Sequence, residues 1–287
     1  MKIDLHLHSN ASDGDFSPTK LVREFKRAGH EAIALFDHDT VKGVPEFLRA
    51  GKKYNIMTVP GVEMSSVHKG YNLHIAGLGI DHTNRNLRQR FRRYREARVK
   101  RARQIVKKLQ KLGFKISFKE VRAKAGGVVN RPHIAQALLE KSANQELLKK
   151  FTRKKLTASH VIQALISQGK PAYVRYQKES TASDIKRIQA AGGLAIFCHP
   201  WFSKELQPRI SIEKLLRSLK RIGIDGIEAF PRPPYSKQKD KYIRLARKYN
   251  LIPSSGSDFH GPVHNQKIPK YQTPDWVLAD ILKKLEK

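Results

Sequence analysis

The chain has 287 residues, in which 57 Lys and Arg oppose 25 Asp and Glu, so its formal net charge is +32. Because 39% of the residues are hydrophobic, the chain can bury a full core, so disorder is not the default interpretation. A charge excess of this size favours a polyanionic partner, above all nucleic acid, while solvated Lys faces in a basic proteome are the alternative.

The single cysteine, Cys198, excludes an internal disulfide framework and fits a reducing compartment. Every apolar run is too short for a signal peptide or a membrane span. We therefore expect a soluble, cytoplasmic protein with no membrane and no disulfide partner.

Short apolar runs alternate with amphipathic stretches in the first third of the chain. The predicted strands cover residues 3–7, 32–36, 57–62 and 73–80, with helices over residues 18–28 and 44–54. This rhythm is typical of an α/β protein with a mainly parallel sheet.

Residues 85–112 hold thirteen Lys or Arg and the single acid Glu96, with apolar residues at roughly helical spacing. They predict one basic helix or two, whose charged side either contacts phosphate or is only hydrated. Shorter helices are predicted over residues 118–123, 132–141, 145–151 and 159–168. We interpret residues 99–175 as a helical insertion between two parts of one barrel domain, residues 1–98 and 176–287.

The α/β rhythm returns in the last third of the chain. Helices are predicted over residues 182–191, 212–222 and 237–249, and strands over residues 194–198, 226–230 and 252–255. The strands of both blocks number about seven, enough to close a barrel.

His6 and His8 stand two apart on a predicted strand, so both imidazoles project from one face and can reach one ion. Asp13 follows them in the sequence. Further His and acidic residues lie near the ends of predicted strands, and one more lies inside a predicted strand. These further residues are His38, Glu63, His74 (the one within a strand), His199, Asp258 and His260. Because the carboxyl ends of barrel strands converge on one face, we expect all nine to form a metal cluster there.

Some neighbouring residues allow a plainer interpretation. Asp4, Asp37, Asp39 and Ser257 either orient imidazoles or form turns. Cys198 could be a nucleophile, but its place on a buried strand favours an inert core residue.

Five short motifs carry a resemblance to a known family. The runs are residues 4–14 (DLHLHSNASDG), 37–39 (DHD), 61–63 (GVE), 198–200 (CHP) and 256–260 (GSDFH). Together they resemble the signature of the PHP (polymerase and histidinol phosphatase) family of metal-dependent phosphoesterases. Residues 131–133 (RPH) and 74–78 (HIAGL) most resemble its bacterial nucleoside 3′,5′-bisphosphate phosphatase and 5′-to-3′ exoribonuclease branch.

The resemblance implies a distorted (β/α)7 barrel holding three divalent ions, most often manganese, with iron or zinc as alternatives. It implies three ligand sets, in which Glu63 bridges the first two ions. The sets are His6, His8, Glu63 and Asp258; then Glu63, His74 and His199; then Asp13, His38 and His260.

A metal-activated hydroxide is then expected to attack phosphorus without a protein nucleophile. The predicted catalytic residues are Glu63, His199, Asp258 and His133. Arg131, His133, Lys170 and Arg175 are predicted to bind a second phosphate, and His133 could protonate the leaving oxygen.

The expected activity is hydrolysis of the 3′-phosphate of nucleoside 3′,5′-bisphosphates, trimming of 5′-phosphorylated RNA, or both. The charge favours RNA as at least one substrate, because a mononucleotide needs only a few local cations. The alternatives are a histidinol-phosphate or other small phosphomonoester phosphatase, and a non-catalytic basic RNA-binding protein.

Overall fold

The computed structural model describes residues 2–125, 128–152, 154–175, 179–201, 211–230, 235–269 and 273–286. The chain forms two compact units. Met1–Gln89 and Lys178–Lys287 make the first, which we name the sheet unit, and Arg90–Gln177 make the second, the helical unit. The domain limits predicted at 98/99 and 175/176 stay a prediction.

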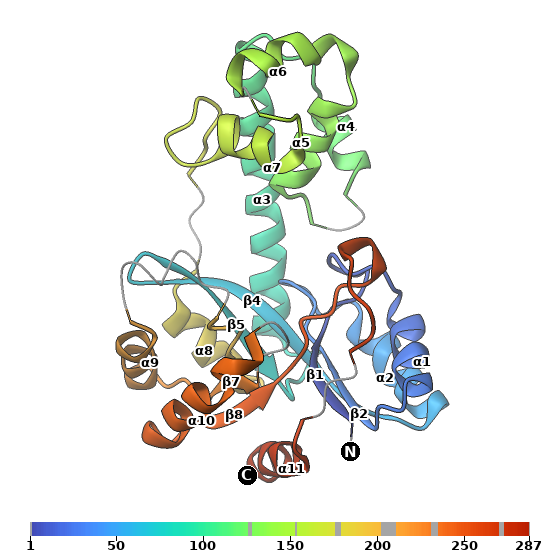
Figure 1. The fold of residues 1–287 in the computed structure, drawn as a ribbon, viewed down its shortest axis with the longest axis vertical. Coiled ribbons are helices and arrows are strands. Elements are labelled where there is room, and N and C mark those ends of the chain that lie inside the picture. The colour runs from blue at the N-terminus through green and yellow to red at the C-terminus, as the bar shows by residue number, and fades with distance from the viewer. Residues whose placement is uncertain are drawn as a thin grey trace. The chain divides into compact units, whose positions relative to one another are not determined.

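Two sheets lie in the sheet unit (Figure 1). The first is parallel and has the order β1 (Ile3–Leu7), β2 (Ala32–Leu35) and β3 (Met57–Val59). The second has the order β4 (Gly61–His68), β5 (Tyr71–Leu78), β6 (Leu194–Phe197), β7 (Gly226–Phe230) and β8 (Ile252–Ser255). In it, β5 is antiparallel to both β4 and β6, whereas β6, β7 and β8 are parallel.

The β4–β5 hairpin corrects one prediction. The apolar run of residues 57–62 is not one strand, because β3 ends at Val59 and a new strand begins at Gly61. Glu63 therefore lies near the start of β4 and not at the end of a strand. The hairpin turns at Lys69 and Gly70, whose φ values are 49° and 83°, as a two-residue turn of type I′ requires.

Helices pack against these sheets. The sheet unit contains α1 (Pro18–Arg27), α2 (Val44–Tyr54), α8 (Thr181–Ala190), α9 (Ile212–Arg221), α10 (Lys239–Lys248) and α11 (Asp275–Leu285). Contacts place α8 against β4, β5 and β6, and α10 against β7 and β8. β2 is buried at every position, which is typical of a parallel strand. The predicted helices and strands of the last third are confirmed, but α11 was not predicted.

Two isolated parallel bridges join the two sheets at the carboxyl ends of β1 and β2. Leu7 pairs with Phe259, which follows β8, and His38, which follows β2, pairs with Glu63 of β4. The mixed α/β class is confirmed. The ladders among the described residues form two sheets, so the predicted closed barrel is not confirmed.

The helical unit holds most of α3 (Arg85–Lys111), which is one continuous helix and not two. The remaining helices are α4 (Phe118–Ala123), α5 (Arg131–Leu139), a 3₁₀ turn (Ser142–Asn144), α6 (Gln145–Phe151), α7 (Ala158–Val161) and a π-helical turn (Ile162–Ile166). They surround a separate apolar core that includes Leu109, Leu138 and Leu165. A membrane-spanning helix is absent from the described residues, because none is both long and apolar enough.

Candidate metal centre

His6 of β1 and His8, which follows the last residue of that strand, are fully buried. His6 and His8 share a face of the strand, and their Nε2 atoms lie 3.0 Å apart. Gly256 makes this packing possible, since a Cβ at residue 256 would lie 2.0 Å from Cβ of His6. The glycine of the GSDFH motif is thus explained by a close approach to the site.

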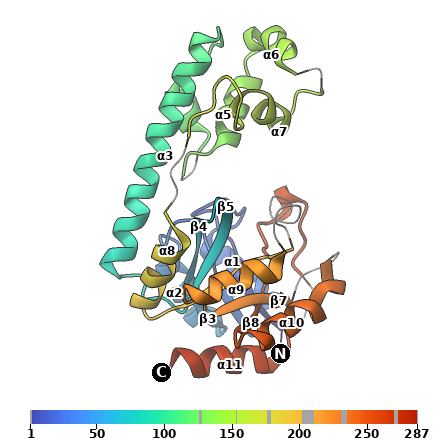
Figure 2. The same cartoon turned by 90° about the vertical axis from the view of Figure 1, so that its left-hand side faces the viewer.

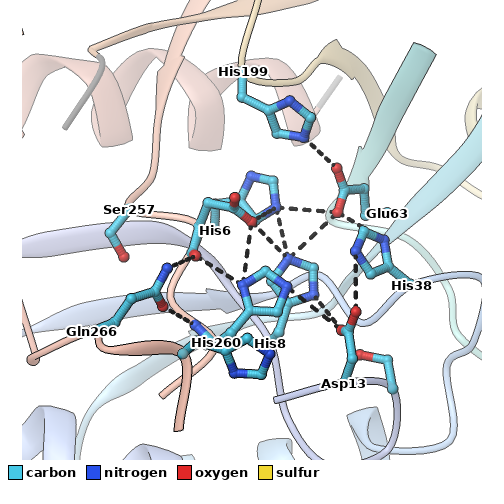
Figure 3. Close-up of polar contacts among 12 residues, drawn as sticks. His6, His8, Asp13, His38, Glu63, His199, Ser257, His260 and Gln266 are labelled. Atoms are coloured by element: carbon cyan, nitrogen blue, oxygen red, sulfur yellow. Dashed lines mark hydrogen bonds and ion pairs between the residues drawn. The ribbon is translucent and has the colours of Figure 1, made fainter. Parts of the chain in front are cut away.

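Glu63 is the centre of the cluster and is fully buried (Figure 3). Its Oε1 lies 2.8 Å from Nδ1 of His74 and 2.8 Å from Nε2 of His199. Its Oε2 lies 3.0 Å from Nδ1 of His38 and 3.4 Å from Nε2 of both His6 and His8. The two oxygens therefore face two separate sets of imidazoles.

Asp258 and Asp13 complete the cluster. Oδ1 of Asp258 lies 3.1 Å from Nε2 of His8. Asp13 lies 3.7 Å from Nε2 of His38 through Oδ2, and 3.5 Å from Nε2 of His260 through Oδ1. The structure thus brings all nine predicted ligand residues together.

Ligand atoms within 4.8 Å of one another form three groups among the predicted residues. The groups are His6, His8, Glu63 and Asp258; His8, Asp13, His38 and His260; and His38, Glu63 and His74. The first matches a predicted set. In the second His8 joins the predicted three, and in the third His38 stands where His199 was expected. The division of the ligands among ions stays a prediction.

Several buried polar atoms in the cluster have no hydrogen-bond partner among the described residues. They include Nδ1 of His8, and also Nδ1 of His38 and His74, which lie within 3.0 Å of the Glu63 oxygens but without the geometry of a hydrogen bond. Lone pairs buried in this way are costly unless something compensates them. Imidazole nitrogens mixed with carboxylate oxygens are the donor set of Zn²⁺, Mn²⁺ and Fe²⁺, so the residues fit the divalent ions that were predicted.

The charges of Glu63 and His8 suit metal binding, whereas His38 must lose a proton to bind an ion. Burial lowers the pKa of His38, but Glu63 and Asp13 outweigh this effect and raise the pKa to about 10. Burial raises the pKa of Glu63, but His74, His38 and His6 outweigh this effect and hold the pKa well below its ordinary value. Burial, together with the imidazole of His260, lowers the pKa of His8 to about 3. Glu63 is therefore ionised and His8 neutral, the forms in which these side chains bind metals.

Two acids beside the cluster, Asp37 and Asp4, accept hydrogen bonds from nearby backbone amides and hydroxyl groups. Asp37 accepts hydrogen bonds from the amide and hydroxyl of Ser9, at 2.7 and 2.6 Å, and from the hydroxyl of Ser12 at 2.7 Å. Asp4 accepts from the amide of Ser257 at 2.9 Å. These contacts favour the turn-forming role over orientation of imidazoles for Asp4 and Asp37.

The sequence prediction missed Glu228 of β7. Its Oε1 lies 2.5 Å from Nδ1 of His6, and its Oε2 accepts from the backbone amide of His199 at 2.5 Å. Glu228 is 1% exposed, and the only signal in the sequence is an acid inside an apolar strand. Glu228 also groups with His6 and Cys198 as possible ligands.

Cys198 is an inert core residue, as expected. Burial, with Glu228 and Glu63 nearby, raises the pKa of the Cys198 thiol well above its ordinary value.

The predicted substrate-binding residues lie in the helical unit. Arg131, Lys170 and Arg175 are exposed. His133, in the first turn of α5, accepts a hydrogen bond from the amide of Asn130 through Nδ1, at 3.0 Å. Their roles, including the catalytic role of His133, stay predictions.

Comparison with known families decides the class of the protein. The PHP domain profile matches residues 4–196. The chain belongs to the PHP domain family. The matched stretch contains six of the nine cluster residues, from His6 to His74.

Relatives of this PHP protein match nearly its whole length. A 5′-3′ exoribonuclease of Haemophilus influenzae is 34% identical, over 91% of this chain and 90% of the relative. A 3′,5′-nucleoside bisphosphate phosphatase of Chromobacterium violaceum is 31% identical, over 96% and 95%. A solved structure from Bifidobacterium adolescentis, assigned as a metal-dependent phosphoesterase, has a TM-score of 0.80 at 26% identity and covers 98% of this chain and 96% of its own.

Proposed function

We propose that this PHP protein is a metal-dependent phosphoesterase that removes the 3′-phosphate of nucleoside 3′,5′-bisphosphates, trims 5′-phosphorylated RNA from its 5′ end, or does both. The observation that carries the proposal is the position of Glu63, whose two oxygens face separate sets of imidazoles. A carboxylate placed in this way can bridge two ions. The two relatives with these activities support the choice of substrate.

Three divalent ions are proposed, with manganese first and iron or zinc as alternatives. The proposed ligand sets are His6, His8, Glu63 and Asp258; Glu63, His74 and His199; and Asp13, His38 and His260. When bound, such ions neutralise phosphate oxygens and supply a hydroxide nucleophile at neutral pH. The protein then contributes rigid placement of the ligands, because His6, His8 and Glu63 are fully buried and Glu228 holds His6 and His199.

The second phosphate of the substrate is proposed to bind Arg131, His133, Lys170 and Arg175. The guanidinium groups of Arg131 and Arg175 are exposed, and their planar fork matches two phosphate oxygens at once. His133 is the proposed acid for the leaving oxygen. Its Nδ1 accepts from a backbone amide, which fixes the orientation of the ring.

For the fold, we infer a distorted barrel of the PHP type. The two isolated bridges support it, because they connect β1 to the segment after β8 and the end of β2 to β4. In the proposed barrel, β3 is an outer strand beside β2, and the bridges connect the ends of the two sheets into a ring. The cluster then lies where the bridges join the sheets.

A phosphate-release assay with manganese tests the proposal on a nucleoside 3′,5′-bisphosphate and on a 5′-phosphorylated RNA oligomer. We expect His6→Ala and Glu63→Gln to lose at least about 100-fold in kcat/KM on either substrate. This exceeds the loss of about 10- to 100-fold that is usual when a residue supporting a metal ligand is removed, because these variants remove proposed ligands themselves. His82→Ala is the matched control, because His82 lies in the sheet unit outside the cluster. Wild-type activity no faster than that of Glu63→Gln on both substrates contradicts the proposal.

A further inference from the structure

The positive charge of the protein is concentrated in the helical unit. Arg90–Gln177 contain 24 Lys or Arg against four Glu and no Asp, a net +20 of the total +32. Fewer than a third of the residues thus carry most of the charge, and none of the nine cluster residues is among them. The metal centre therefore does not account for this concentration.

The four acids of the helical unit are already engaged. Glu96 lies 3.7 Å from Arg92, Glu120 lies 2.6 Å from Lys141, Glu146 lies 2.6 Å from Lys149, and Glu140 pairs with Lys124. Each acid thus faces a basic side chain of its own. The basic residues of the unit outnumber its acids by 24 to four.

Six basic residues of the unit, of which Arg92 is the one paired with Glu96, form a row on α3 that we name the α3 stripe. The row consists of Arg92, Arg93, Lys100, Arg103, Lys107 and Lys111, all of them exposed. At 3.6 residues per turn they share one face and span about 28 Å. The opposite face, with Ala102, Ile105 and Leu109, is buried in the core of the unit. Figure 2 shows α5, α6 and α7 on one side of α3 only.

We propose that the α3 stripe binds the phosphodiester backbone of an RNA strand outside the metal centre. The choice of RNA rests on the proposed function, whereas the binding of a polyanion rests on charge complementarity. A row of cations about 28 Å long exceeds what a mononucleotide can contact, but it matches several successive phosphates. Flexible Lys and Arg side chains suit such contacts, which position a strand without reading its sequence.

The test variant is Arg93→Gln/Lys100→Gln/Lys107→Gln, which removes three charges at seven-residue spacing along the stripe. Gln has nearly the same helix propensity as Lys and Arg, so α3 is preserved. The matched control is Lys214→Gln/Arg217→Gln/Arg221→Gln, which removes three exposed charges from α9 in the sheet unit. Both are made in the full chain with Asp13→Asn, which removes one proposed ligand and slows cleavage during binding.

Binding of a single-stranded, 5′-phosphorylated RNA oligomer is measured by fluorescence anisotropy at several salt concentrations. Each lost phosphate contact reduces the slope of log K against log salt by about 0.7 for single strands, so the stripe variant should lose about 2 in slope. If the curves converge near 1 M salt, this slope corresponds to about 100-fold weaker binding at 0.1 M. The α9 control should lose no more than a small part of this.

Unchanged RNA binding in the stripe variant, or an equal loss in the α9 control, overturns the proposal. In the first case the α3 stripe binds an acidic protein or is only hydrated. In the second case RNA binding depends on the total charge of the chain and not on the stripe. Without Asp13→Asn, the stripe variant should hydrolyse the bisphosphate mononucleotide at the wild-type rate. A wild-type chain that hydrolyses nothing, while the stripe variant still loses RNA binding, refutes the proposed function and leaves the stripe proposal standing.

Discussion

Oε1 of Glu228 lies 2.5 Å from Nδ1 of His6, so an acid of β7 holds an imidazole of β1. The second oxygen of Glu228 accepts from the backbone amide of His199. Because Nδ1 of His6 is engaged, its Nε2 is the atom that faces Glu63 at 3.4 Å and Asp258 at 3.5 Å. One carboxylate outside the predicted ligand sets thus fixes the ring of one proposed ligand and the backbone of another.

Replacing Glu228 should weaken metal binding. In Glu228→Gln the amide presents a single acceptor oxygen, so it cannot serve both His6 and His199, and we expect 10- to 100-fold lower Mn²⁺ affinity. Metal content after dialysis against buffered Mn²⁺ measures this directly. Glu213→Gln is the control, since Glu213 pairs with Lys248 on the surface. Equal affinity in wild type and Glu228→Gln would show that the contact with His6 does not support the ligand.

Divalent metal should stabilise the folded chain. An ion that binds only the folded state at 100 times its dissociation constant adds about 2.7 kcal/mol, which raises Tm by several degrees. Differential scanning fluorimetry with and without Mn²⁺ checks this. The shift should persist in His82→Ala and shrink in Glu63→Gln, which removes an oxygen from the centre of the cluster. A shift of equal size in Glu63→Gln would locate the stabilising ion elsewhere.

Gly256 should tolerate no side chain. The added Cβ of Gly256→Ala would meet Cβ of His6 at 2.0 Å and the His6 backbone nitrogen at 2.8 Å, so β1 or the loop after β8 must shift. We expect a loss of about 1–3 kcal/mol in unfolding free energy, the range for overpacking, and weaker Mn²⁺ binding. Ser254→Ala is the control, because the buried Ser254 hydroxyl has no hydrogen-bond partner among the described residues. Urea unfolding in which Gly256→Ala equals Ser254→Ala would contradict the steric account.

His30 should make the protein less stable in mild acid. Burial lowers the pKa of His30 to about 4, and its Nδ1 lies 3.2 Å from the carbonyl oxygen of Phe25. The unfolded chain takes up a proton near pH 6.5 and the folded chain only near pH 4, so stability is lost as the pH falls between these values. The loss is at most about 1.4 kcal/mol per pH unit.

The measurement is the change in unfolding free energy from pH 7.5 to pH 5, wild type against His30→Gln, both free of metal. The variant should lose less stability than the wild type, because it lacks the buried imidazole. Titrations in the metal cluster affect both chains and cancel in the difference. Parallel pH profiles would show that His30 does not contribute.

Local patterns in the sequence predicted much of the fold. The strands at residues 226–230 and 252–255 are confirmed, since short apolar runs bounded by turns specify them locally. The β4–β5 hairpin was missed because the apolar run continues through the break between Val59 and Gly61, although the Lys69-Gly70 turn was available as a signal. The antiparallel order of β4, β5 and β6 depends on contacts between distant segments, which periodicity does not encode.

In the candidate site, too, local patterns predicted some residues, whereas others depend on contacts between distant segments. His6, His8 and His38 were predicted as neighbours because they follow or occupy strands of one parallel sheet, whose ends converge. Glu63 was included because it follows the predicted strand at residues 57–62, but its position near the start of β4 became visible only in the fold. Glu228 escaped notice because one acid inside a strand has no meaning until His6 is seen opposite it.

The central claim is that the cluster around Glu63 binds several divalent ions. Anomalous diffraction from crystals grown with Mn²⁺ tests it most directly. Peaks are expected among His6, His8, Glu63 and Asp258, and again among Asp13, His38 and His260, within about 2.0–2.2 Å of their ligand atoms as is usual for first-row divalent ions. Full occupancy by Mn²⁺ at other positions, with no peak beside Glu63, would contradict the account.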